Sequence, residues 1–302
     1  MNDTVLIAGG SGLIGMRLSE LLVEKGYRVV HLSRSKKTKG PYDTYLWDPE
    51  KGYMDEEALE KATVVINLAG AGIADKPWTE ARKQLIINSR VDTASLLLES
   101  FRKTGHWPKA YLSGAAIGYY GHRGDEWLYE TSTPGTGFLA ESCIAWEDAI
   151  DQIGQSGLRT VAFRIGLVLS TSGGALEKIL LPFHFFTGAY FGDGNQWYSW
   201  IHIDDLCEMF IMAIEKESMK GIYNAVAPHP VTNKEFVRTI KEVRNKPAFM
   251  ASVPVLALRA AMGEMADVVL NSNRVSSEKI AQAGYPFLYP QLKAALQQLL
   301  ND

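Results

Sequence analysis

The sequence predicts an α/β fold, in which a doubly wound parallel sheet carries a smaller, mostly helical C-terminal lobe. Three observations support this. Residues 4–32 read as strand, glycine turn, helix and strand, the pattern of a βαβ crossover. Apolar strands without polar alternation then alternate with helices up to residue 168, as in a parallel sheet covered on both faces. From Thr232 onward helical patterns dominate.

Each expected element has a local signal. The first strand, TVLIA at 4–8, ends at Gly9-Gly10, and apolar residues at helical spacing follow until Gly26, which we expect to end the helix. Residues 187–195 are rich in glycine and read as a loop. Further strands are expected at 28–32, 64–67, 110–113, 160–168 and 221–227, and helices at 79–104, 138–156, 204–214, 233–243, 255–270 and 290–300.

Composition excludes several classes of protein. With 302 residues, 46% of them hydrophobic, the chain can build a full core and is not disordered. A net charge of −3 gives no electrostatic reason to expect nucleic acid or a membrane as partner, and no apolar run approaches the roughly 20 residues of a span. Two isolated cysteines indicate neither a disulfide framework nor a metal site. We expect a cytoplasmic protein with a nucleotide-binding domain at 1–230, carrying substrate-lobe insertions after about residue 170, and a helical domain at 231–302.

The turn Gly9-Gly10-Ser11-Gly12-Leu13-Ile14-Gly15 has the glycine spacing of a dinucleotide-binding loop. Its glycines permit a tight turn, close approach of backbone N–H groups to a pyrophosphate, and close packing of helix on strand. The turn follows a strand and opens a helix, which is the context that the motif requires. A purely structural turn is the alternative.

The end of the second strand predicts which dinucleotide binds. An acidic residue there would bond the ribose hydroxyls of NAD, but the sequence reads Ser33-Arg34-Ser35-Lys36-Lys37. A guanidinium and hydroxyls suit the 2′-phosphate of NADP(H), with Arg34 as the main selector, and make NAD(H) the less favoured cofactor. A solvated basic loop is the alternative.

Further motifs resemble one family throughout the chain. They are Asn67-Leu68-Ala69-Gly70, Ser89-Arg90, GYYG at 118–121, RIGLVL at 164–169, GDGNQWYSWIHIDD at 192–205, NAVAP at 224–228 and Gly263-Glu264. With the glycine turn, they resemble the extended short-chain dehydrogenase/reductases, which have a Rossmann fold. The resemblance is to the epimerase-like sub-group related to nucleoside-diphosphate-sugar epimerases, including its C-terminal domain.

This resemblance implies roles for particular residues. Five positions of the glycine turn would line the pyrophosphate, with Gly15 beneath them, and Ser33 with Arg34 would hold the 2′-phosphate. The turn residues are Gly9, Ser11, Gly12, Leu13 and Ile14. Leu68, Ala69 and Gly70 would lie beside the adenine and its ribose. Ser89 and Arg90 would lie on a helix that passes the cofactor, and Val168 would lie near the nicotinamide. For Arg90 a surface salt bridge is the alternative.

The chain departs from the family pattern where proton transfer takes place. Extended reductases use Tyr-x-x-x-Lys, but residues 111–165 contain no such pair, and the matching positions hold Leu139 and Cys143. The family's serine position is ambiguous, because Ser113 is followed by alanines one turn nearer Tyr120. We therefore name Tyr120, Ser113 and His202 as catalytic candidates. Packing in a wall of the site is the alternative for Tyr119 and Tyr120, and a structural histidine tied to the next turn is the alternative for His202.

The substrate region departs as well. Sugar-nucleotide epimerases carry an arginine just before the segment that matches WIHIDD, whereas residues 196–200 read QWYSW without a cation. Buried phosphates without a cation would be poorly compensated, so we expect a flatter or less charged ligand near Tyr119, Trp197 and Trp200. For both tryptophans, a place in the core is the alternative.

These patterns predict an NADP(H)-dependent epimerase-like oxidoreductase that acts on an unidentified small substrate by hydride transfer. The alternative is a non-catalytic NADP(H)-binding sensor or partner-binding protein that kept the nucleotide site and lost its acid/base residues. A homodimer is compatible with either interpretation, and no metal is expected.

Overall fold

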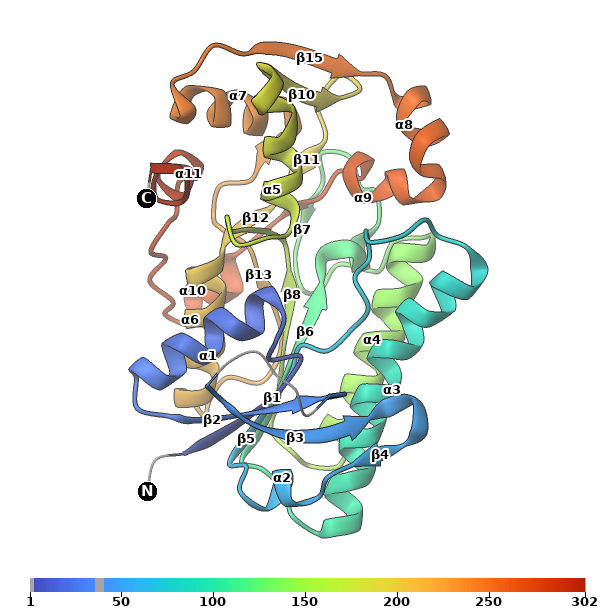
Figure 1. Cartoon of the computed structure of the whole chain (residues 1–302), viewed down its shortest axis with the longest axis vertical. Helices are drawn as coiled ribbons and strands as arrows, with labels where there is room; N and C mark the ends of the chain where they lie inside the picture. The colour runs from blue at the N-terminus through green and yellow to red at the C-terminus, as the bar shows by residue number, and fades with distance from the viewer. Residues whose placement is uncertain (1–2, 36–40, 302) are drawn as a thin grey trace.

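The computed structural model describes residues 3–35 and 41–301, so Lys36 and Lys37 of the expected basic segment lie outside the described residues. Its main sheet has eight strands in the order β13-β8-β6-β5-β1-β2-β3-β4, all parallel except that β4 runs antiparallel to β3 (Figure 1). The strands are β1 (Thr4–Ala8), β2 (Arg28–Ser33), β3 (Asp43–Asp48), β4 (Tyr53–Met54), β5 (Val64–Asn67), β6 (Ala110–Ala116), β8 (Thr160–Ile165) and β13 (Gly221–Ala225).

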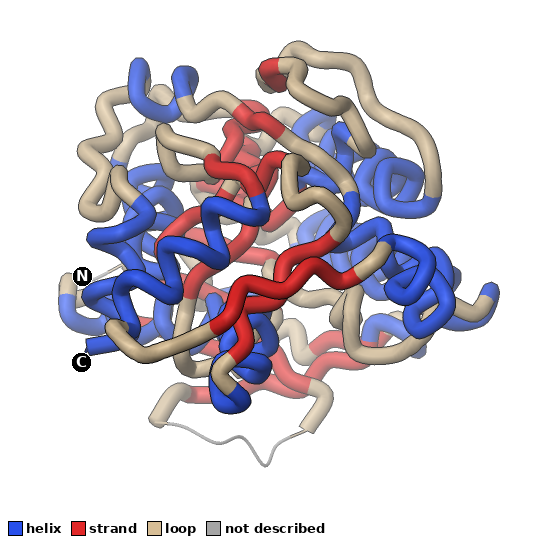
Figure 2. The backbone as a smooth tube through the Cα atoms, turned by 90° about the horizontal axis from the view of Figure 1, so that it is seen from above, coloured by secondary structure: helices blue, strands red, loops and turns tan. Residues whose placement is uncertain are grey.

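Helices cover both faces of this sheet, as Figures 1 and 2 show. The helices are α1 (Leu13–Glu24) and α6 (Ile203–Glu215) on one face, and α3 (Glu80–Thr104) and α4 (Phe138–Gln155) on the other, with the short α2 (Glu57–Glu60) beside β4. Alternate residues of β1 point to opposite cores, with Val5 and Ile7 packing against α1 and α6 while Leu6 packs toward α3 and α4. The doubly wound α/β prediction is therefore confirmed.

The second lobe is built from short helices and two-stranded sheets around its own apolar core, which includes Leu176, Trp200, Phe236 and Leu296. The strands pair as β10 (Thr187–Phe191) with β15 (Phe249–Val253), β11 (Trp197–Tyr198) with β14 (Val231–Thr232), β9 (Leu167–Leu169) with β12 (Trp200–His202), and β7 (Trp127–Leu128) with β16 (Arg274–Val275). The helices are α5 (Ala175–Leu180), α7 (Asn233–Arg244), α8 (Val255–Met262), α9 (Asp267–Leu270), α10 (Glu278–Gln282) and α11 (Leu292–Asn301). The division at residue 230 stays a prediction, and the β10–β15 pair joins strands from either side of it.

Three passages of chain between the lobes lie side by side. At Gly166 the chain leaves the main sheet, and the β9 strand that follows pairs with β12, the strand that leads back into α6. The third passage follows β13, where Ala227 N–H donates to the carbonyl of Trp200 at 2.6 Å. The backbones touch here, since a Cβ on Gly166 would overlap the carbonyl oxygen of Ser199.

The structure corrects several expected elements. The single strand expected at 160–168 is two strands, β8 and β9, because the chain turns at Gly166 from one sheet to another. The helix expected at 255–270 is broken into α8, a 3-10 turn η4 (Gly263–Ala266) and α9. Part of the expected 187–195 loop is strand β10, and the strands β3 and β4, which complete one side of the main sheet, were not expected. Within residues 3–35 and 41–301, no helix combines the length and apolar character that crossing a membrane requires.

Candidate functional site

The glycine turn connects β1 to α1 with very little space around it. Gly9 has a φ of +80°, and a Cβ there would lie 2.7 Å from the carbonyl carbon of Leu68, at the start of the loop after β5. A Cβ on Gly15 would overlap the carbonyl oxygen of Gly9, so only glycine lets α1 pack this closely on the turn. Ser11 and Gly12 are exposed, while Leu13 and Ile14 are half-buried.

The first backbone N–H groups of α1 are available to bind an anion. Its N-cap is Gly12, which has no side chain to cap the helix, no side chain among the described residues accepts from the first-turn N–H groups, and the first turn holds no acidic residue. The first N–H groups of a helix have no partners within it, and the helix dipole favours negative charge there. The turn predicted from the sequence therefore has the geometry of a phosphate-binding loop.

Two residues that the sequence analysis did not single out support this turn from below. The Ser19 hydroxyl lies 2.6 Å from the Gly15 carbonyl oxygen, to which it donates, and 2.8 Å from Nε2 of His31. Because the Ser19 hydroxyl donates its proton to Gly15, its oxygen can only accept from His31. Nε2 of His31 therefore carries a proton and donates it to Ser19. Burial lowers the pKa of His31 to about 4, so the ring is neutral, and it fills the space that a Cβ on Gly10 would need. In the sequence, the feature that could have indicated this role is a histidine within the strand RVVHLS, which is otherwise mostly apolar.

Ser33 and Arg34 lie at the carboxyl end of β2, next to the glycine turn, because Ala8 and Leu32 are partners in the β1–β2 register. The Ser33 hydroxyl accepts from the N–H of Ser35 at 3.2 Å. Arg34 is exposed, and within the described part of the chain no carboxylate pairs with it. A free cation at this edge is what the 2′-phosphate of a dinucleotide would require.

The loop after β5 faces the N-terminal half of α3. Leu68 and Ala69 are half-buried and Gly70 is exposed, and the Ser89 hydroxyl holds the loop by accepting from the N–H of Ala71 at 2.9 Å. Arg90 donates to the carbonyl of Ile86 at 2.8 Å, and its Cζ lies 4.9 Å from the ring of Trp146.

No described carboxylate forms an ion pair with Arg90, so the surface salt bridge considered above is not made among these residues. Burial lowers the pKa of its guanidinium. Arg90 lies against the glycine of the same loop, since a Cβ on Gly70 would be 3.2 Å from its Cζ. Val168, in β9, is half-buried and packs against the core beneath α6.

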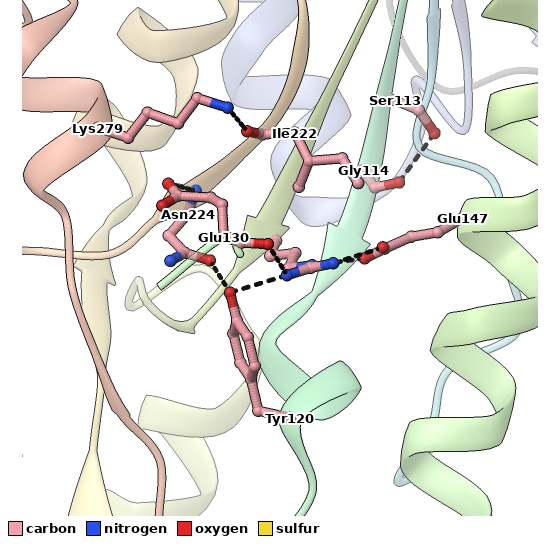
Figure 3. Close-up of polar contacts among 9 residues, drawn as sticks. Ser113, Gly114, Tyr120, Glu130, Glu147, Ile222, Asn224 and Lys279 are labelled. Carbon is pink, nitrogen blue, oxygen red and sulfur yellow. Dashed lines mark hydrogen bonds and ion pairs between the residues drawn. The ribbon is translucent and has the colours of Figure 1, made fainter. Parts of the chain in front are cut away.

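Tyr120 ends η2 (Ile117–Tyr120), the turn that follows β6, and it has no exposed surface. Its hydroxyl donates to Oδ1 of Asn224 at 2.7 Å and accepts from Arg164 at 2.9 Å (Figure 3). Arg164 also makes a two-point ion pair with Glu147, both contacts 2.7 Å long. The ring of Tyr119 lies 3.5 Å from the Arg164 guanidinium carbon. Tyr120 is thus one member of a buried and fully bonded polar network.

This environment does not favour proton transfer by Tyr120. Burial raises the pKa of its hydroxyl to about 12, although Arg164 acts in the opposite direction. A tyrosine that acts as a general base near neutral pH needs a lowered pKa. No local sequence pattern predicts this network, and an arginine within the apolar run RIGLVL is the one unusual residue that points to it.

The other proton-transfer positions are also apolar or buried. The hydroxyl of Ser113 lies in β6 without exposed surface and donates to the carbonyl of Gly114 at 2.8 Å (Figure 3). Leu139 and Cys143 face η2 from α4, since a Cβ on Gly118 would lie 3.3 Å from the Cys143 sulfur and 3.7 Å from the Leu139 Cβ. Burial raises the pKa of the Cys143 thiol to about 12, so it stays protonated at neutral pH.

His202 is the N-cap of α6. Its Nδ1 accepts from the N–H of Asp204 at 3.1 Å, so Nε2 carries the proton and donates to Oε1 of Gln298 at 2.9 Å. Burial lowers the pKa of this imidazole. The arrangement matches the structural alternative given for His202, in which the ring is tied to the turn that follows it.

The two candidate substrate tryptophans lie in different surroundings. Trp200 has no exposed surface and donates from Nε1 to the carbonyl of His229 at 3.0 Å, within the core of the second lobe. Trp197 is half-buried, and its Nε1 donates to Asp125 at 2.7 Å. A ligand could reach Trp197 directly, whereas contact with Trp200 would require the core to open.

A pocket of about 430 Å³ opens between the lobes, beside the N-terminal ends of α3 and α4 and against η4 and α9. Trp78, Lys83, Phe138 and Glu264 are among its lining residues. A larger hollow of about 660 Å³ lies between the C-terminal end of α4 and the β13 edge, at the start of β8. That hollow is at the opposite end of the strands from the glycine turn, so we assign it no part in the site.

Comparisons with known proteins agree with this geometry. Residues 5–225 match the model of the NAD dependent epimerase/dehydratase family, and residues 253–299 match a domain of unknown function, DUF1731. An epimerase family protein of Staphylococcus saprophyticus is 36% identical over 300 residues, which are 98% of this chain and 99% of that protein.

Two solved structures cover nearly the whole chain. The human epimerase family protein SDR39U1 (isoform 2), crystallised with NADPH, has a TM-score of 0.89 and 30% identity, with 99% of each chain covered. A nucleoside-diphosphate sugar epimerase from Corynebacterium glutamicum has a TM-score of 0.80 and 32% identity, and the match covers 99% of this chain and 58% of that one.

Proposed function

The chain belongs to the NAD dependent epimerase/dehydratase family, and on that premise we propose that it is an NADP(H)-dependent oxidoreductase of the epimerase-like type, acting on a small substrate. The observation that carries the proposal is the glycine turn, with its uncapped helix N-terminus and three glycines that tolerate no side chain. The phosphates would lie against the N–H groups at the start of α1.

The residues at the end of β2 support NADP(H) over NAD(H). Arg34 is exposed and unpaired among the described residues, and no acidic residue stands where one would repel a 2′-phosphate. The human SDR39U1 structure, which contains NADPH, supports the same choice at 30% identity. Ser33 would add a hydroxyl to this subsite.

The bound nicotinamide would supply or accept a hydride. Arg90, a cation without a carboxylate partner among the described residues, would lie along the cofactor beside the loop that carries Gly70. Tyr120, Ser113 and His202 remain the proposed proton-transfer residues, and Tyr120 would need to break its bond to Asn224 before it could act. A cytoplasmic location and assembly as a homodimer also remain proposals.

One observation favours the second candidate function, a non-catalytic NADP(H)-binding sensor or partner-binding protein. Leucine and cysteine occupy the positions of the family's tyrosine and lysine, and the hydroxyls of Ser113 and Tyr120 beside them are buried and bonded. Such a protein would bind the cofactor tightly without turnover. A change in partner binding with and without NADPH would be its signature.

Calorimetry with the purified protein tests the cofactor. We expect NADPH to bind at least about tenfold more tightly than NADH, because a charge-assisted bond to the 2′-phosphate contributes roughly 1.5–3 kcal/mol. The variant Arg34→Ala should lose most of this preference and leave NADH affinity unchanged. Equal affinity of the wild-type protein for both coenzymes would contradict the assignment, as would tighter NADH binding.

Steady-state oxidation of NADPH, measured across panels of carbonyl compounds and sugar nucleotides, separates the two functions. Turnover with any member supports the oxidoreductase. Tight NADPH binding with no turnover on either panel, combined with a cofactor-dependent pull-down, would favour the sensor.

A further inference from the structure

Arg274 has unusual surroundings on the second lobe. Its guanidinium carbon lies 4.3 Å from the ring of Trp127 and 4.3 Å from the ring of Trp197. The three residues come from β16, β7 and β11, and Arg274 is the register partner of Trp127. The fold therefore builds a cation held by two indoles from segments that are far apart in the sequence.

The charge of Arg274 is not compensated by the described residues. No described carboxylate lies within ion-pair distance of it, and its buried Nε has no hydrogen-bond partner. The carboxylate of Asp125 accepts from the indole of Trp197, one of the two rings on Arg274, at 2.7 Å. Stacking on aromatic rings uses the face of a guanidinium and leaves the N–H groups along its edge free to donate.

The segment that carries Arg274 is fixed at the carboxyl end of the main sheet. Asn273 donates to the carbonyl of Gly121, the residue that follows η2, and Ser272 donates from its backbone to Nδ1 of His122 at 3.2 Å. The Ser272 hydroxyl in turn accepts from the N–H of Trp197 at 3.0 Å. This is the end of the strands where the glycine turn lies and where ligands bind in open α/β sheets.

We propose that Arg274 is a binding residue for an oxyanion, a carboxylate or a phosphate, carried by the substrate. The inference rests on the proposed function and names the substrate class. It also replaces the expectation of a less charged ligand, because the cation missing from 196–200 reaches Trp197 from the C-terminal segment. A planar fork of N–H donors suits the two oxygens of such a group.

Titration of the full-length protein with oxyanions, in the presence of saturating NADPH, tests this proposal. Saturating cofactor occupies the phosphate loop, so that only a second site can respond. Inorganic phosphate and acetate are titrated separately while tryptophan fluorescence is followed, because two of the seven tryptophans contact Arg274. We expect a saturable change with at least one anion, and the preferred anion identifies the substrate group.

The variant Arg274→Gln should weaken this anion binding about tenfold or more, since a charge-assisted contact is lost. Its NADPH affinity should remain that of the wild-type protein. Arg238→Gln, at an exposed position on α7, is the matched control and should change neither quantity. If Arg274→Gln does not fold, Arg274→Lys serves instead, because it keeps the charge and loses the planar fork.

Two results would overturn the proposal. One is unchanged anion affinity in the Arg274 variants, and the other is the lack of any saturable response to phosphate or acetate in wild-type protein that binds NADPH normally. Failure of NADPH binding itself would instead contradict the proposed function, so the two failures are distinguishable.

Discussion

The glycine turn and the region around η2 differ in how closely their residues follow the family pattern. At the glycine turn, glycine occupies the positions where a Cβ would overlap its neighbours, Gly12 gives α1 no side-chain cap, and Arg34 at the end of β2 has no carboxylate partner among the described residues. Around η2, the hydroxyls of Ser113 and Tyr120 are buried and bonded, and Leu139 and Cys143 lie beside Gly118 of that turn. A fold of this kind can keep the backbone shape of a dinucleotide-binding turn while the side chains elsewhere change.

The largest expected effect is a loss of folding stability when the polar network around Tyr120 is broken. Glu147→Gln would leave the Arg164 charge buried without its partner, which typically lowers the free energy of unfolding by about 3–5 kcal/mol. Urea unfolding measures this change. Replacing Glu147 and Arg164 together by methionine should recover part of it, and an unchanged unfolding midpoint in the single variant would mean that the pair is not formed.

The next largest expected effect is a loss of NADPH affinity when the glycine turn is changed. Gly15→Val places a side chain against the carbonyl oxygen of Gly9 and moves α1 away from the turn. We expect NADPH affinity to fall by about 100-fold or more, equivalent to roughly 2.7 kcal/mol, in a protein that still folds. Gly154→Ala in α4 is the control, because its Cβ would make only ordinary contacts with Thr160. Calorimetry on both variants checks this, and equal affinities would remove the turn from the binding site.

Tyr120→Phe sharpens the comparison at the other end. It removes the hydroxyl that Asn224 and Arg164 share, so stability should fall by about 1–3 kcal/mol, while NADPH affinity should not change. If Tyr120 supplies the proton, as proposed, any turnover found in the wild-type protein should be lost or strongly reduced in the variant. Full turnover in a variant that loses only stability would remove Tyr120 from proton transfer, in line with its pKa, which burial raises to about 12.

The smallest effect is a pH dependence at His31. The folded pKa of this histidine is lowered from 6.5 to about 4, so between these values the unfolded chain binds a proton that the folded chain does not. Stability should therefore be unaffected above pH 6.5 and should fall as the pH drops from 6.5 toward 4. His31→Gln should show a smaller difference between unfolding at pH 7 and at pH 5. A variant with the same acid sensitivity as wild type would assign it to other groups.

Local sequence patterns were sufficient to predict most of the helices and strands of the main sheet. β1 and β5 have the predicted bounds, and α3 begins one residue after the predicted start, because Thr79 is its N-cap. The motifs in the nucleotide half were sufficient to identify the extended short-chain dehydrogenase/reductase family, an identification that the family model and the relatives confirm.

The remaining features depend on contacts that no local pattern encodes. The bond between Tyr120 and Asn224 joins residues 104 positions apart. Arg274 reaches Trp197 through two-residue strands that have no periodicity to detect. Prediction from sequence was strongest where function resides in backbone shape and weakest where side chains from distant segments meet.

The three side-by-side passages between the lobes have a mechanical consequence. A single linker would act as a swivel, but here β9, β12 and the segment after β13 are cross-linked by backbone hydrogen bonds. Twisting one lobe against the other would shear those bonds together, so the joint resists torsion. The spacing between the glycine turn and the second lobe should therefore stay constant when a ligand binds.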